Sequence, residues 1–239
     1  MPVLKTAQEI LNAANAELGL PAATFNGPPG DQTGRQASAM IQAIGDDLCR
    51  VHDWQFLESF YTFIGDGSTD AFALPTDFGR IVNQTLWATT DSQIVQGPVG
   101  PQTWGWLKYG LVSTDGTPYR YRVLNNEIRI HPAPADGAEF LFYYIKKNWI
   151  YTYITNVEKN TLSLAGDRPM FDGRLMVSAL KVRLWGQKGF DTTQVQQEFN
   201  FVLASEKSIS QGAPVIDLTG GRHSYLISSG NLPEGNWNV

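Results

Sequence analysis

The apolar residues of this chain change their spacing twice, and this constrains the fold more than any single motif does. They recur at intervals of three and four residues up to position 51, alternate over most of residues 55–154, and return to helical intervals between 171 and 209. A period of two indicates strands, and a period near 3.6 indicates helices. The pattern predicts an α+β fold, in which a helical bundle of about four helices carries an inserted antiparallel β domain and an extended C-terminal arm.

The same changes of period predict the domain boundaries. We expect an N-terminal helical pair (1–54), an antiparallel β domain (55–165), a C-terminal helical pair that completes the bundle (166–211), and an extended docking arm (212–239).

The first helical pair has clear start and stop signals. Thr6 is the expected N-cap of a helix that ends at Leu18, with Glu9 completing a capping box and Gly19 stopping the helix. A link rich in glycine and proline, FNGPPGDQTG, leads to a second helix. The apolar stripe of that helix comprises Ala37, Met40, Ile41, Ile44, Leu48 and Val51.

The second helical pair is expected after the segment LAGDRPMF. Asp167 is the predicted N-cap of the third helix, with Pro169 in its first turn. Gly186 and Gly189 interrupt the pattern before a fourth helix, which extends to about Ile209.

The middle of the chain reads as strands and turns. FLESFYTFI, AFALP and RIVNQTLWAT are strand candidates. A hairpin is expected where YRYRVL is followed by Asn125-Asn126 and EIRIH, because asparagine tolerates the positive φ that a two-residue turn needs. The segment EFLFYYIKKNWIYTYI is apolar on both faces, so we expect a helix or a neighbouring subunit to cover its second face.

The hairpin register places like charges opposite each other. Arg122 faces Arg129, and Arg120 faces His131. Such pairs are unfavourable, so we expect this face to meet carboxylates, either that of Glu127 or those of another chain.

The stretch GPVGPQTWGWLKYG, residues 97–110, combines two tryptophans with glycines and prolines that predict irregular backbone. Its only charge is that of Lys108. Trp104 and Trp106 point to opposite faces if the segment is extended. One is then expected to anchor the segment to its own domain, while the other meets a neighbour.

The last 28 residues show neither a helical nor a strand period. Their apolar residues, including Tyr225, Leu226, Ile227 and Trp237, are too few for a core and too many for a solvated tail. An arm that docks on another chain explains both facts.

Charge and motifs argue against an enzyme. The net charge is −5, and no basic run exceeds Lys146-Lys147, which disfavours tight DNA binding. Cys49 is the only cysteine, and the three histidines lack metal-ligand spacing. No nucleophile elbow or phosphate-binding loop occurs. We therefore expect no catalytic, cofactor or metal residues, and a soluble protein made in a cytoplasm without a membrane partner.

Four blocks in order resemble a family of tailed-bacteriophage head-to-tail adaptor proteins: DWQFL, ALPTDFGRIVNQTLW, GPVGPQTWGWLKYG and YRYRVLNNEIRIHPAP. The resemblance implies a ring, usually of twelve copies, in the neck of the virion between the portal and the tail tube or nozzle. It further implies that the C-terminal arm reaches the portal, that double-stranded DNA passes through the ring, and that no activity or cofactor is involved.

Two other functions stay open at this point. The chain could be a tail-tube or nozzle component that does not touch the portal. From a different class, it could be a carbohydrate-binding module or glycosidase, whose tryptophans stack on sugars. The candidate subunit or partner contacts are Trp104, Trp106, Lys108, Arg120, Arg122, Arg129, Tyr225, Leu226, Ile227 and Trp237.

Overall fold

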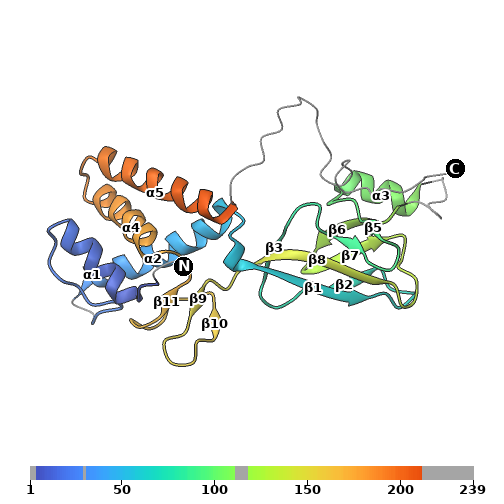
Figure 1. The fold of residues 1–239 in the computed structure, drawn as a ribbon, viewed down its shortest axis with the longest axis horizontal. Helices are drawn as coiled ribbons and strands as arrows, with labels where there is room; N and C mark the ends of the chain where they lie inside the picture. The colour runs from blue at the N-terminus through green and yellow to red at the C-terminus, as the bar shows by residue number, and fades with distance from the viewer. Residues whose placement is uncertain (1–3, 29–30, 111–117, 212–239) are drawn as a thin grey trace, which may run out of the picture.

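A helical lobe and a β lobe lie side by side along the long axis of the molecule (Figure 1). The computed structural model describes residues 4–28, 31–110 and 118–211. The architecture confirms the predicted α+β fold with antiparallel sheets inserted into a helical bundle. The predicted arm, 212–239, lies outside the described residues.

The helical lobe consists of α1 (Ala7–Glu17), α2 (Gln32–Val51), α4 (Gly173–Gln187) and α5 (Thr193–Gln211). The predicted capping box is present at the start of α1. The backbone N–H of Glu9 donates to Oγ1 of Thr6 at 3.2 Å, and the backbone N–H of Thr6 donates to Oε2 of Glu9 at 2.8 Å. Gly19 follows the helix with a φ of +65°, which a glycine adopts without strain.

The second helix begins inside the segment that the sequence suggested was a link. Asp31 caps α2, because its Oδ1 accepts from the backbone N–H of Gly34 at 2.8 Å. Its other oxygen accepts from the backbone N–H of Thr24 at 3.0 Å. One carboxylate thus starts the helix and holds the preceding loop against it.

The predicted start of the third helix is wrong. Asp172, rather than Asp167, caps α4 by accepting from the backbone N–H of Arg174 at 2.8 Å. Asp167 is fully buried and accepts from Lys159 Nζ at 2.6 Å and from two backbone N–H groups of the preceding loop. Pro169 lies in a short strand, so neither residue is available to begin the helix.

The β lobe contains two antiparallel sheets. The first has the order β1 (Glu58–Ile64), β8 (Glu139–Lys146), β4 (Trp87–Ala88) and β5 (Gln93–Ile94), with β3 (Phe78–Ile81) also paired to β8. The second has the order β2 (Ala71–Ala73), β7 (Glu127–His131) and β6 (Arg120–Leu124). A 3-10 turn (Gln55–Leu57) joins α2 to β1, and a helix, α3 (Pro101–Tyr109), lies over this lobe (Figure 1).

The predicted hairpin forms between β6 and β7 in the expected register. Asn125 and Asn126 have φ values of +53° and +61°, and Arg122 pairs with Arg129. Val123 lies opposite Ile128, and Tyr121 opposite Ile130, as the alternation predicts.

Two strand predictions are longer than the strands observed. RIVNQTLWAT is divided into the end of β3 and the whole of β4 by a turn in which Gln84 has a φ of +61°. The long apolar segment that begins at Glu139 ends its strand at Lys146. It continues in a small sheet of β10 (Glu158–Lys159), β9 (Ile150–Tyr151) and β11 (Arg168–Pro169) under the helical lobe (Figure 1).

The two faces of β8 differ in how they are buried. Phe140, Phe142 and Tyr144 are buried in the core of the β lobe. On the second face, Ile145 enters the core of the helical lobe, whereas Tyr143 remains 39% exposed beside its cross-strand partner Phe60. The helical lobe therefore covers only one end of this face.

Candidate interaction surfaces

The prediction of irregular backbone holds for residues 97–100 but is wrong for 101–109, because the part of the segment that carries the two tryptophans is helical. Pro101 occupies the first turn of α3, where its missing N–H costs nothing, and Gly100 is the N-cap. Residues two apart lie on opposite sides of a helix as they do on a strand. Trp104 is accordingly buried and packs edge-on against His131, while Trp106 is 58% exposed. The expectation that one tryptophan anchors the segment to its own domain is confirmed for Trp104.

Lys108 secures α3 to the turn that joins β1 to β2 in the β lobe. Its Nζ forms an ion pair with Asp70 and lies 5.8 Å from the centre of the Trp104 ring. Lys108 lies four positions after Trp104 in α3, so both side chains share one helical face. Burial of Trp104 also means that this ring cannot stack on a sugar.

The arginine face of the hairpin is only partly neutralised. Arg129 forms an ion pair with Glu127, two residues away on the same strand, at 3.2 Å. Within the described residues, Arg120 and Arg122 have no ion pair. The expected carboxylate thus comes from Glu127 for one of the three arginines. The four predicted contact residues of the arm, Tyr225, Leu226, Ile227 and Trp237, lie outside the described residues.

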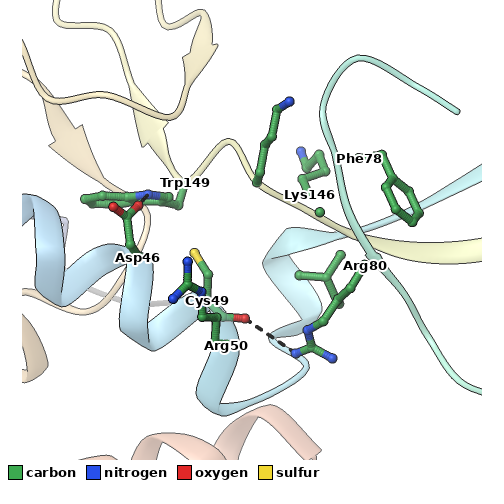
Figure 2. A pocket seen from close by; sticks show the side chains of 10 residues that line it. Asp46, Cys49, Arg50, Phe78, Arg80, Lys146 and Trp149 are labelled. Carbon is green, nitrogen blue, oxygen red and sulfur yellow. Dashed lines mark hydrogen bonds between the residues drawn. The ribbon is translucent and has the colours of Figure 1, made fainter. Parts of the chain in front are cut away.

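A cavity of about 310 Å³ opens where the two lobes meet (Figure 2). The helical lobe supplies Asp46, Cys49 and Arg50 from α2, and the β lobe supplies Phe78 and Arg80 from β3. Lys146, Lys147 and Trp149, at and after the end of β8, complete the lining. Four cations and one carboxylate therefore surround this space, which we call the junction pocket.

Arg80 joins the two lobes at the edge of the junction pocket. Its guanidinium pairs with Asp53 and donates through Nη2 to the carbonyl of His52 at 3.0 Å. The same nitrogen donates to the carbonyl of Cys49 at 3.4 Å (Figure 2). Both carbonyls belong to the C-terminal end of α2, where the helix dipole favours a cation. The guanidinium of Arg80 therefore has a structural role, because its contacts hold β3 to the end of α2.

The only cysteine lines the junction pocket but is not activated. Burial, together with the nearby carboxylate of Asp46, raises the pKa of Cys49 to about 12. The thiol therefore stays protonated at neutral pH and is a poor nucleophile. Among the described residues, no group of three or more His, Cys, Asp or Glu is placed to hold a metal ion.

Sequence reasoning missed the junction pocket as a site. Its signal was present in Lys146-Lys147, the longest basic run of the chain, but Arg50 and Arg80 are far from it in sequence. Only the packing of α2 against the ends of β3 and β8 brings the four cations together.

A family model described as "SU10 adaptor protein" matches residues 5–166. The match covers the first helical pair, the whole β lobe, and β9 and β10 of the small sheet, and it ends before β11. No curated protein matches the chain. No helix in the described ranges is long and apolar enough to cross a membrane.

Proposed function

Because the chain belongs to the SU10 adaptor protein family, a family of phage head-tail adaptors, we propose that it forms a ring joining the capsid portal to the tail. Membership of a structural adaptor family implies a non-enzymatic role in the virion. The family match over residues 5–166 is the observation that carries the proposal.

The proposed ring has twelve copies and lies in the neck of the virion, between the portal and the tail tube or nozzle. It assembles in the host cytoplasm, requires no cofactor, and has no membrane partner. Double-stranded DNA passes through it without sequence-specific binding. The acidic balance of the chain, with a net charge of −5, suits such a conduit, because strong phosphate binding would retain the DNA.

Exposed apolar side chains support the proposal that this chain is a subunit with neighbours on more than one side. Phe60 is 61% exposed and Ile64 is 64% exposed on one face of the large sheet. On α3, Trp106 and Tyr109 are 58% and 86% exposed. Apolar surface at two separate places is typical of a protein that contacts more than one partner.

We assign the interface role to the exposed and half-buried members of the predicted contact set. On α3 this is Trp106, with Lys108 on the opposite face beside Trp104, and on the hairpin it is the half-buried Arg120 and Arg122, with Arg129 flanking them. Trp104 contributes indirectly, by holding α3 in place. The arm beyond Gln211 is proposed to reach the portal.

Capture by purified portal rings tests the proposal. Full-length chain is mixed with portal rings, and separately with purified tail-tube or nozzle protein, and bound chain is quantified after sedimentation. Stoichiometric capture by portals, visible as an added ring by electron microscopy, supports the adaptor. Binding to tail protein alone would instead favour a tail-tube or nozzle component.

A further inference from the structure

Two of the four cations in the junction pocket have no ion-pair partner among the residues that the structure describes. Lys146 pairs with Glu158 at 2.7 Å, and Arg80 pairs with Asp53. Arg50 and Lys147 are exposed and have no ion pair or side-chain hydrogen bond within the described part of the chain. These two side chains leave positive charge available at the mouth of the pocket.

The one carboxylate of the junction pocket does not neutralise them. Oδ1 of Asp46 accepts from Trp149 Nε1 at 3.0 Å and from Gln42 Nε2 at 3.1 Å, which turns it toward the Trp149 side (Figure 2). Trp149 itself is buried and forms a flat wall of the pocket. The site is thus a hollow of about 310 Å³ whose free donors suit an anionic side chain.

The opposite end of the large sheet is acidic. Three turns meet there, over residues 65–70, 89–92 and 132–139, and none of them contains a lysine or arginine. Besides Asp70, which pairs with Lys108, these turns carry four exposed carboxylates. We call this group the acidic tip: Asp66, Asp91, Asp136 and Glu139.

Backbone contacts hold the acidic tip together. The backbone N–H of Gly137 donates to the carbonyl of Gly65 at 3.0 Å, and that of Glu139 donates to Thr90 Oγ1 at 3.0 Å. Asp66 accepts from Thr69 and Ser68, which keeps its pKa well below the ordinary value and the group ionised. The tip is therefore an ordered acidic surface.

The acidic tip and the junction pocket cannot meet within one chain. Glu139 begins β8 and Lys146 ends it, so an extended strand of eight residues separates them. At 3.3 Å per residue this is roughly 23 Å of rigid sheet. The exposed side chains of Phe60, Ile64 and Tyr143 lie on the same sheet between the two ends.

We propose that two copies of this chain associate head to tail, with the acidic tip of one copy seated at the junction pocket of the next. The carboxylates of Asp136 and Asp91 then meet Arg50 and Lys147, and the neighbour covers the apolar face between them. The contact uses two different surfaces, so it repeats from copy to copy and closes into a ring when the rotation allows. This proposal rests on the proposed function and supplies the ring with its subunit contact.

Charge reversal tests the contact, because all four side chains are exposed and their replacement should not disturb folding. The pocket variant carries Arg50→Glu and Lys147→Glu, and the tip variant carries Asp91→Lys and Asp136→Lys. For each variant alone, the dissociation constant of self-association should rise by about tenfold or more at low ionic strength, because like charges then face each other. Sedimentation velocity over a concentration series measures the loss.

Mixing the two variants is the decisive experiment. The reversed pocket of one then faces the reversed tip of the other, and the remaining contact is native, so association should return with alternating subunits. Lys188→Glu, on an exposed lysine outside the pocket, serves as the matched control and should associate like the wild type.

A wild-type chain that stays monomeric at every concentration, or variants that associate normally, would overturn the contact. Failure of the mixture to recover would do the same. Portal capture of the same proteins is measured separately: normal capture with no effect of charge reversal rejects the contact alone. Self-association without portal capture rejects the portal-joining role and leaves the contact standing.

Discussion

The indole of Trp149 lies directly on Gly45 of α2 and donates from Nε1 to Oδ1 of Asp46 at 3.0 Å. A β-carbon at position 45 would lie 2.1 Å from Cη2 of the ring, which is far inside van der Waals contact. The absence of a side chain at Gly45 therefore allows the segment after β8 to pack against the helical lobe.

Gly45→Ala should destabilise the protein by about 1–3 kcal/mol, because the tryptophan is buried and cannot move without opening the core. Urea unfolding followed by fluorescence measures the change. Gly105→Ala is the matched control, since nothing lies within 4 Å of a β-carbon there. In α3 that substitution should be neutral or stabilising by up to about 1 kcal/mol. Equal effects at the two positions would contradict the packing argument.

The two tryptophans of α3 should separate stability from assembly. Trp104→Ala removes a buried ring and should cost about 3 kcal/mol of unfolding free energy. Trp106→Ala removes an exposed ring and should change stability by less than about 0.5 kcal/mol, while weakening ring or partner contacts. Thermal unfolding and sedimentation on the same samples compare the two. A large loss of stability from Trp106→Ala would place this ring in the monomer's own core.

Asp167 should make stability fall in acid. Burial raises the pKa of this carboxyl, but its hydrogen bonds to Lys159 and to the backbone of Leu164 and Ser163 outweigh this and lower it. A lowered folded-state pKa means that stability is fully present above the unfolded value, near 3.9, and is lost as pH falls through the folded value.

The test compares the wild type with Asp167→Asn between neutral pH and about pH 3. The variant should be less stable by about 1–3 kcal/mol at neutral pH, because Lys159 loses its buried partner. It should also lose less stability on acidification. Parallel pH profiles would show that other carboxylates cause the acid sensitivity.

Truncation after Gln211 tests the proposed division of the chain at 212. The truncated protein should keep the circular dichroism spectrum of the full chain and unfold within a few degrees of it, while capture by portal rings falls by about tenfold or more. Unfolding of the truncated chain would instead make residues 212–239 part of the core.

Local sequence signals predicted the elements whose contacts are local. The capping box at Thr6 and Glu9 closes within one helical turn, and the Asn125-Asn126 turn determines the register of β6 and β7 on either side. These features were recognisable because neighbouring residues satisfy one another's hydrogen bonds.

Predictions were wrong where distant residues decide the outcome. Asp167 has the right position for a helix cap, but Lys159 and the backbone of the preceding loop already use its carboxylate. Gly97–Gly110 has the composition of a loop, yet burial of Trp104 against His131 of the hairpin stabilises a helix over Pro101–Tyr109. Propensity is a weak prior that tertiary contacts override.

The spacing of apolar residues was enough to predict the two helical pairs, the hairpin register and the two-faced character of the strand at Glu139–Lys146. Tertiary packing, in contrast, sets where the cations of the junction pocket gather. Arg50 and Lys147 are separated by almost a hundred positions, and the packing of α2 against the end of β8 brings both to one pocket. Spacing along a chain carries no information about such a meeting, since it depends on how two lobes bury their cores against each other.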